Sequence, residues 1–325
     1  MTTDIYLNTS ETKANSGFRF QQRDSVILKA IHDYDGVLAR RHIKWLFWPD
    51  KGWRSMEKRL AKLYEADYVT WPSLDERKSH PIPEAILWLN WKGALYLAGK
   101  AGIFIETPNK INENQLRTFE RKLKEQGFYW LRTPRWSQLG HDLKLVDIRL
   151  GIQDSLAEID HLVLEEYINE STFRVHTDVV SYPLQKGDGS WVTRRRGVIP
   201  DGYFSVVDTN RRNQGQPHKA RFLLEVDMAT HDNPSFGNEK VLPGLAYLKS
   251  KAYRDRFGSN AGLWLVVTTG DRRMKNLIRQ TLSKARSQQH PFLFTTFASL
   301  NSANFFRDPI WIQSDLERPK ALIER

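Results

Sequence analysis

Cysteine is absent from this sequence of 325 residues, and so is any long apolar run. The lack of thiols excludes disulfides, cysteine-based zinc sites and a thiol nucleophile, and it fits a reducing compartment. No segment approaches the ~18 apolar residues that a membrane helix needs. Residues 1–17 are polar and lack apolar periodicity, so we expect a flexible tail there rather than a signal peptide. These absences predict a cytoplasmic protein with no membrane partner.

Acidic residues are too few to balance the basic ones. The chain has 49 Lys and Arg against 38 Asp and Glu, which gives a formal charge of +11. Residues 18–64 contain eleven Lys and Arg against five Asp and Glu, and residues 240–286 contain eleven against two. Two separate basic segments favour a nucleic acid as partner, whereas either segment alone could also be a solvated surface.

The N-terminal quarter predicts three helices followed by two short strands. Apolar residues recur at helical spacing over residues 22–34, 37–47 and 51–66, and β-prone runs follow at 67–71 and 84–90. Residues 91–100 predict a closing helix. This order is typical of a winged helix-turn-helix domain. We place that domain at residues 18–100, with residues 101–139 as a connector.

The third predicted helix carries the candidate DNA contacts. Its expected buried stripe consists of apolar residues at helical spacing: Trp53, Met56, Leu60, Leu63 and Tyr64. Its other faces present polar and basic residues as DNA-binding candidates: Lys51, Arg54, Ser55, Lys58, Arg59 and Lys62. Lys and Arg neutralise phosphates, and Arg54, Ser55 and Arg59 could reach base edges. Winged helices also bind proteins, so a purely protein partner stays an alternative.

The C-terminal half, residues 140–325, alternates helical and strand patterns. It predicts helices over residues 142–159, 239–254 and 272–286, and strands over 162–168, 198–207, 221–227, 263–268 and 292–297. Carboxylates stand on two of these strands, Asp201 on one and Glu225 and Asp227 on the next. Residues i and i+2 of a strand share a face, so Glu225 and Asp227 point the same way. Asp201, Glu225 and Asp227 are therefore candidate ligands for Mg²⁺ or Mn²⁺.

The order of elements and the carboxylates resemble the PD-(D/E)xK nuclease superfamily, in Pro200-Asp201 and in Glu225-Val226-Asp227. The resemblance implies a mixed α/β protein whose second domain has a restriction-endonuclease-like αβββαβ core. It also implies catalytic roles for Asp201, Glu225 and Asp227. The superfamily's lysine position holds Asp227, which cannot supply a positive charge. Lys240, on the following predicted helix, could reach the site instead.

A more specific resemblance is to the replication-relaxation family of bacterial and mobile-element proteins. It rests on Pro200-Asp201-Gly202, on the run Leu223–Asp227 and on Lys240 and Tyr247. His141, ahead of the long helix, also looks like part of that family's motif, but we interpret it as a helix-start or packing residue. The resemblance covers residues 18–290 and implies a winged helix joined to the nuclease-like domain. It further implies a role in plasmid or mobile-element maintenance.

Further basic residues could contact DNA near the carboxylates. They lie just before Asp201 and in the last predicted helix: Arg194, Arg195, Arg196, Arg272 and Arg273. Two hypotheses follow. The chain is a DNA-binding protein of a mobile element whose nuclease-like domain serves replication, transfer or regulation, or it is an active Mg²⁺- or Mn²⁺-dependent DNA endonuclease. The missing lysine favours the first hypothesis. Double-stranded DNA is the expected partner in both, and a homodimer stays open.

Overall fold

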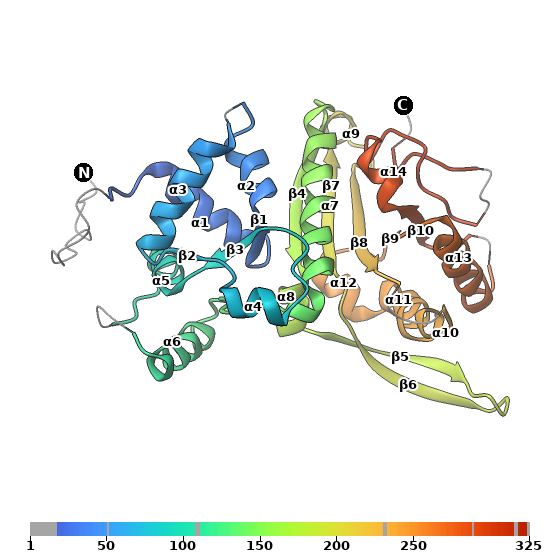
Figure 1. The fold of residues 1–325 in the computed structure, drawn as a ribbon. Coiled ribbons are helices and arrows are strands. Elements are labelled where there is room, and N and C mark those ends of the chain that lie inside the picture. Colours follow the sequence, from blue (N-terminus) through green and yellow to red (C-terminus); the bar gives the residue numbers. More distant parts are fainter. Residues whose placement is uncertain are drawn as a thin grey trace. The chain divides into compact units, whose positions relative to one another are not determined.

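The computed structural model describes residues 18–50, 52–107, 111–229, 233–287, 289–314 and 318–323. They fall into two units, one that ends at Leu139 and one that begins at Gly140 (Figure 1). The protein is a mixed α/β protein with a separate sheet in each unit. In these residues no helix combines the length and the apolar character that crossing a membrane requires. The predicted tail over residues 1–17 lies outside the described residues.

The N-terminal unit contains helices around a small antiparallel sheet with strand order β1-β3-β2. Its strands are β1 (Val37–Ala39), β2 (Val69–Thr70) and β3 (Ile86–Leu89). Its helices are α1 (Gln22–Asp33), α2 (Arg40–Phe47), α3 (Trp53–Glu65), α4 (Leu74–Ser79), α5 (Trp91–Lys100) and α6 (Glu113–Glu125), followed by a 3₁₀ turn, Trp136–Gln138.

The helix predicted over residues 37–47 begins later than expected. Val37–Ala39 is a strand that pairs antiparallel with Ile86–Trp88, and all three of its residues are buried. The sheet therefore holds them extended, and α2 begins only at Arg40. The polar segment between the two predicted strands contains α4, whose first turn is capped by the Ser73 hydroxyl.

Helix α3 confirms the core of its predicted stripe but not the edges. Met56, Leu60 and Leu63 are almost fully buried. Trp53 is 49% exposed and Tyr64 is 41% exposed, so their prediction as buried residues is wrong. Both lie near the ends of the helix, where the core no longer covers them.

Residues 101–139, expected as a connector, pack onto the N-terminal unit. The indole of Trp130 is buried and donates a hydrogen bond to the carbonyl of Leu89 at 3.1 Å. In the same way the Trp88 indole donates to the carbonyl of Arg132 at 2.9 Å. Phe119 of α6 packs edge-on against Trp130. The segment therefore belongs to the core of the N-terminal unit.

The C-terminal unit is built on a five-stranded mixed sheet of order β10-β9-β8-β7-β4 (Figure 1). Strands β4, β7 and β8 are antiparallel neighbours, and β8, β9 and β10 are parallel. The strands are β4 (Leu162–Asn169), β7 (Gly202–Asp208), β8 (Lys219–Asp227), β9 (Leu263–Thr268) and β10 (Phe292–Thr296). The helices are α7 (Leu139–Ala157), α8 (Glu170–Val175), α9 (Thr209–Asn213), α10 (Asn233–Phe236), α11 (Leu242–Leu248), α12 (Lys251–Phe257), α13 (Asp271–Ala285) and α14 (Phe297–Asn301).

The two faces of this sheet bury alternate residues. Phe222 and Leu224 of β8 pack in the core that contains Ile152 of α7, whereas Leu223 packs in the core that contains Leu277 of α13. Because side chains alternate along a strand, Glu225 and Asp227 must lie on the same face as Leu223. The two carboxylates therefore face the side of the sheet on which α13 packs.

A two-stranded ribbon separates β4 from β7 in the sequence. It consists of β5 (Asp178–Gln185) and β6 (Trp191–Val198), and it runs outward from the sheet (Figure 1). Its turn contains Gly187, Asp188 and Gly189. Val180 and Tyr182 of β5 are buried in the same core as α11, so the ribbon is anchored along one face.

Two predicted elements near the candidate carboxylates are divided. The strand predicted over residues 198–207 ends at Val198 and resumes at Gly202, so Asp201 lies between two strands. The helix predicted over residues 239–254 consists of a π-helical turn (Gly237–Val241) followed by α11 and α12. Single π turns in proteins are frequent at functional sites.

Candidate functional site

Asp201 is fixed against the end of strand β8. Its backbone N–H donates to the carbonyl of Leu224 at 3.0 Å, and its Oδ2 accepts from the N–H of Val226 at 2.6 Å. These two bonds extend the β7–β8 pairing by one residue beyond Gly202. The Asp201 carboxylate is therefore buried and held next to Glu225.

Glu225 is a buried carboxylate that is only half satisfied. Its Oε1 forms an ion pair with Lys240 Nζ at 2.6 Å. Its Oε2 is buried and has no hydrogen-bond partner among the described residues. Burial, opposed by Lys240 and assisted by the charge of Asp201, raises the pKa of Glu225 to about 8. A buried oxygen without a donor is costly, and a bound cation would satisfy it.

Lys240 reaches the site from the π turn. Its side chain is 39% exposed as a whole, and its ammonium pairs with the buried carboxylate of Glu225. Burial alone would lower the pKa of Lys240, but the carboxylates of Glu225 and Asp201 outweigh it and raise that pKa. The predicted approach of this lysine to the carboxylates is confirmed.

His141 belongs to the site, contrary to its interpretation as a packing residue. Its Nε2 lies 3.1 Å from Asp201 Oδ2, and its Nδ1 lies 3.5 Å from Asp142 Oδ1. Burial would lower the pKa of His141, but the charge of Asp201 and the bond to Asp142 raise it to about 10. In turn, His141 holds the pKa of Asp201 below its ordinary value, although burial acts in the opposite direction.

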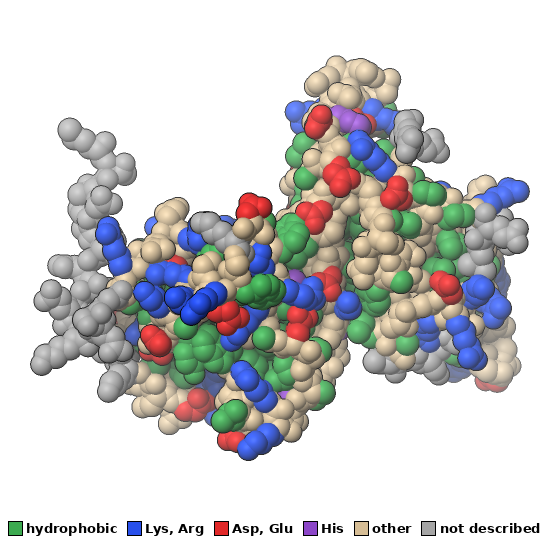
Figure 2. Space-filling model, turned by 45° about the horizontal axis from the view of Figure 1, so that its top comes forward, with side chains coloured by type: hydrophobic (Ala, Val, Ile, Leu, Met, Phe, Trp, Pro, Cys, Tyr) green, Lys and Arg blue, Asp and Glu red, His purple; other side chains and the backbone are tan. Residues whose placement is uncertain are grey.

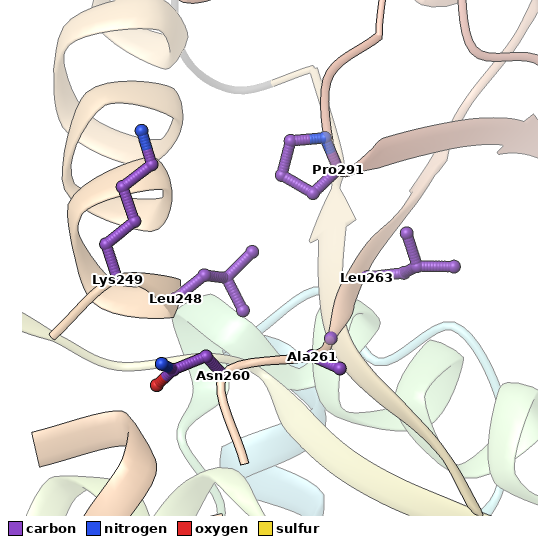
Figure 3. A pocket seen from close by; sticks show the side chains of 7 residues that line it. Leu248, Lys249, Asn260, Ala261, Leu263 and Pro291 are labelled. Atoms are coloured by element: carbon purple, nitrogen blue, oxygen red, sulfur yellow. The ribbon is translucent and has the colours of Figure 1, made fainter. Parts of the chain in front are cut away.

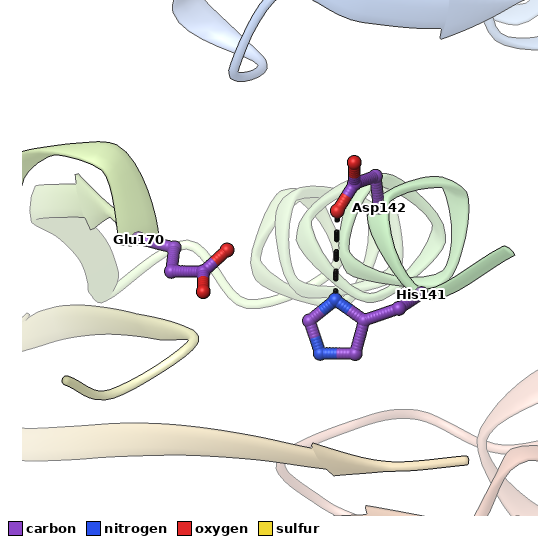
Figure 4. A group of neighbouring side chains, drawn as sticks. All are labelled: His141, Asp142 and Glu170. Carbon is purple, nitrogen blue, oxygen red and sulfur yellow. Dashed lines mark ion pairs between the residues drawn. The ribbon is translucent and has the colours of Figure 1, made fainter. Parts of the chain in front are cut away.

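A further carboxylate, that of Glu170, lies close to His141 and Asp142 (Figure 4). One potential ligand atom each of His141, Asp142 and Glu170 lies within 4.8 Å of the others. Glu170 starts α8 directly after β4 and pairs with Arg174 one turn later. Sequence reasoning missed Glu170, because no motif marks it and only tertiary packing brings it to α7.

Asp227 is engaged away from these groups. Its carboxylate forms a two-pronged ion pair with Arg273 of α13, at 2.8 and 2.7 Å, and accepts from the Thr268 hydroxyl at 2.6 Å. Two residues predicted for different roles, Asp227 for metal binding and Arg273 for DNA binding, are thus joined. The structure brings Asp201 and Glu225 together with Lys240 and fastens Asp227 to α13.

The DNA-binding candidates of the N-terminal unit divide into exposed and buried residues. Arg54, Lys58 and Lys62 are exposed at four-residue spacing on α3, and none has an ion-pair or hydrogen-bond partner among the described residues. Ser55 is exposed and bonds to the carbonyl of Gly52. Lys51 lies outside the described residues.

Arg59 does not face solvent as a DNA contact requires. Its side chain is 11% exposed and pairs with Asp24, which is completely buried. The Nε–Oδ1 distance is 2.7 Å, and a second bond runs from Nη2 to the same carboxylate. Arg59 therefore ties α3 to α1 and contributes to the folded core.

The candidates of the C-terminal unit lie on β6 and α13. Arg194, Arg195 and Arg272 are exposed. Arg196 pairs with Glu239 of the π turn at 3.1 Å. Figure 2 shows Lys and Arg side chains on the visible face of each unit, interspersed with Asp and Glu side chains. Charge alone therefore marks no single binding face, and the partners of each side chain decide which cations are available.

An apolar hollow of about 600 Å³ lies at the opposite end of the strands (Figure 3). It is lined by Leu248, Lys249, Asn260, Ala261, Gly262, Leu263 and Pro291. Leu263 begins β9, whereas Thr268, the partner of Asp227, ends it. The hollow contains no carboxylate and is separate from the candidate site.

Comparison of the chain with protein-family models, with curated proteins and with solved structures finds no match.

Proposed function

We propose that this protein is a DNA-binding, metal-dependent DNA endonuclease. The observation that carries the proposal is the convergence of Asp201, Glu225 and Lys240, with Lys240 Nζ 2.6 Å from Glu225. The lysine that the superfamily pattern places on the strand is supplied here by the next helical turn. This convergence favours cleavage over the non-catalytic alternative, which rested on the missing lysine.

The side chains of the site fit a divalent cation. Asp201 and Glu225 offer hard carboxylate oxygens, and His141 adds a ring nitrogen. Glu225 Oε2 is buried and has no hydrogen-bond donor among the described residues, and a bound cation would satisfy it. When bound, Mg²⁺ or Mn²⁺ would activate water and offset negative charge on a phosphodiester. Asp142 and Glu170, which lie close to His141, would orient its ring.

Lys240 supplies a positive charge at the site in addition to that of a bound metal. Its ammonium is charged and paired with Glu225, and its remaining N–H groups could donate a hydrogen bond to an attacking water or to a phosphate oxygen. Asp227 cannot take that role because a carboxylate has no positive charge, and its oxygens already accept bonds from Arg273 and Thr268.

The N-terminal unit supports duplex binding in this proposal. Its helices and small antiparallel sheet fit a winged helix-turn-helix arrangement, in which α3 would enter the major groove. The unpaired stripe of Arg54, Lys58 and Lys62 supplies the phosphate contacts. The resemblance of the Pro200–Gly202 and Leu223–Asp227 runs to the replication-relaxation family suggests plasmid or mobile-element maintenance as the setting.

The test is a cleavage assay on supercoiled and linear DNA with Mg²⁺ or Mn²⁺. We expect cleavage by the unaltered chain, loss of cleavage in Asp201→Asn, and full activity in Asp255→Asn, an exposed carboxylate of α12. Cleavage that survives Asp201→Asn would refute the assigned site. Tight DNA binding with neither metal supporting cleavage would instead favour the non-catalytic mobile-element regulator.

A further inference from the structure

A row of cations leads away from Lys240 along the C-terminal unit. Lys284 of α13 crosses the π turn, since a Cβ added at Gly237 would lie 3.1 Å from Lys284 Cγ. Arg286 follows at the end of α13, in a left-handed conformation that ends the helix. Lys240, Lys284 and Arg286 therefore line one side of a track that starts at the candidate site.

Strand β6 forms the other side of this track. Arg196 pairs with Glu239, next to Lys240, so this end of the strand lies against the π turn. Arg195, its neighbour, points to the other face of the ribbon, which it shares with Trp191 four residues away. Arg195 is exposed and has no ion-pair or hydrogen-bond partner in the described part of the chain. The positive charge thus continues along β6.

An exposed tryptophan lies at the far end of the track. Trp191 begins β6 and is 54% exposed. The guanidinium carbon of Arg286 lies 5.6 Å from the centre of its ring. This cation–π contact fixes one face of the indole and joins α13 to the ribbon. The other face of the indole is a flat apolar surface beside a row of cations.

Of two acidic residues near the track, Glu239 and Asp188, the first is paired with a cation. Glu239 is neutralised by Arg196, and Asp188 in the ribbon turn bonds to Ser190. The track therefore attracts a polyanion. The exposed indole of Trp191 favours a polyanion that carries flat rings.

We propose that this track binds a single-stranded segment of the DNA substrate and that an unpaired base stacks on Trp191. In a duplex the faces of the bases are covered by neighbouring bases, so only an unpaired base can cover an indole. The inference rests on the proposed function and names its substrate class: DNA in which a duplex adjoins an unpaired strand.

The first experiment compares labelled forked DNA with blunt duplex of the same paired length, with EDTA present so that no cleavage occurs. Fluorescence anisotropy gives the dissociation constants of the full chain. We expect the full chain to bind the fork more tightly than the blunt duplex. Trp191→Ala should weaken fork binding by about 5- to 100-fold. Blunt-duplex binding should not change. Trp191→Phe should keep most of the preference, and Trp45→Ala, which removes another exposed tryptophan, should keep all of it.

The second experiment locates the unpaired strand directly. DNA carrying 5-iododeoxyuridine in its single-stranded arm is irradiated with the full chain, and the crosslinked peptide is identified by mass spectrometry. The expected crosslink is at Trp191. An excess of unmodified fork should compete with it and abolish it. Equal affinity for fork and blunt duplex, or an equal loss for both in Trp191→Ala, would overturn the proposal. Because binding is measured without metal, failure of cleavage alone leaves this result intact and refutes only the endonuclease.

Discussion

Lys240 Nζ and Glu225 Oε1 form a 2.6 Å ion pair between a π turn and a buried strand. The pair places a positive charge beside a carboxylate whose other oxygen has no hydrogen-bond partner among the described residues. A charged lysine from the π turn is thereby held beside Glu225, although the lysine position of the strand is occupied by Asp227.

Replacing Lys240 with Met should reduce DNA cleavage by about 100- to 1,000-fold, because one charged donor near the reacting phosphate is lost. DNA affinity should change by less than about threefold, since one of many cations is removed. Cleavage rates under single-turnover conditions measure the first effect, and anisotropy measures the second. Lys251→Met, at an exposed lysine of α12, is the matched control. An unaltered cleavage rate in Lys240→Met would show that the lysine has no catalytic role.

Asp227→Asn should retain Mn²⁺ binding, whereas Asp201→Asn and Glu225→Gln should lose it. Asp227 is held by Arg273 and Thr268, while Glu225 has a free buried oxygen. Isothermal titration of the purified variants with Mn²⁺ distinguishes them. Loss of Mn²⁺ binding in Asp227→Asn would restore Asp227 to the metal ligands that the sequence predicted.

Replacing Arg54, Lys58 and Lys62 together with Ala should weaken duplex binding and flatten its salt dependence. Each lost phosphate contact lowers the slope of log K against log salt by about 0.9, so about 2 to 3 units should disappear. The same charge is removed in a control by Ala at three exposed cations of α6: Arg117, Arg121 and Lys124. An equal decrease in both triple variants would argue against α3 as the duplex-binding helix.

Arg59→Ala should destabilise the N-terminal unit, because it leaves Asp24 buried without its cation. Breaking a buried ion pair on one side costs about 3 kcal/mol of unfolding free energy. Urea denaturation followed by circular dichroism measures the loss, with Arg54→Ala as the exposed control that should change stability by less than about 0.5 kcal/mol. Equal stability of the two variants would contradict the structural role of Arg59.

The pH dependence of stability should report the pairing of His141 in metal-free protein. The pKa of His141 is raised from 6.5 to about 10 in the folded protein. The stabilisation is therefore complete below about pH 6.5 and disappears as the pH rises towards 10. The stability difference between the unaltered protein and His141→Gln should shrink by about 3 kcal/mol between about pH 6 and pH 9. His176→Gln, at an exposed histidine, should show no such trend.

Local patterns predicted much of the fold, because helices and strands bury apolar residues with distinct periods. Strands β8 and β9 are short apolar runs that are buried on both faces, and α13 buries Met274, Leu277 and Ile278 at helical spacing. The predictions failed where tertiary pairing decides the conformation. Val37–Ala39 is compatible with a helix until β3 is available to pair with it.

The candidate site was predictable in part for the same reason. Asp201 directly precedes β7 and Glu225 lies on the neighbouring strand β8, so pairing of these two strands brings them together. The positions of Glu170 and His141 depend on how α7 and α8 pack against the sheet, which no local pattern encodes. The burial of Arg59 likewise depends on Asp24, 35 residues away, so counting charges overestimates the cations that DNA can reach.

The pair between Asp227 and Arg273 has a mechanical consequence. It anchors the first turn of α13 to the last residue of the strand that carries Glu225. Two hydrogen bonds therefore fix the start of this helix to the strand end, two residues from the carboxylate beside Lys240.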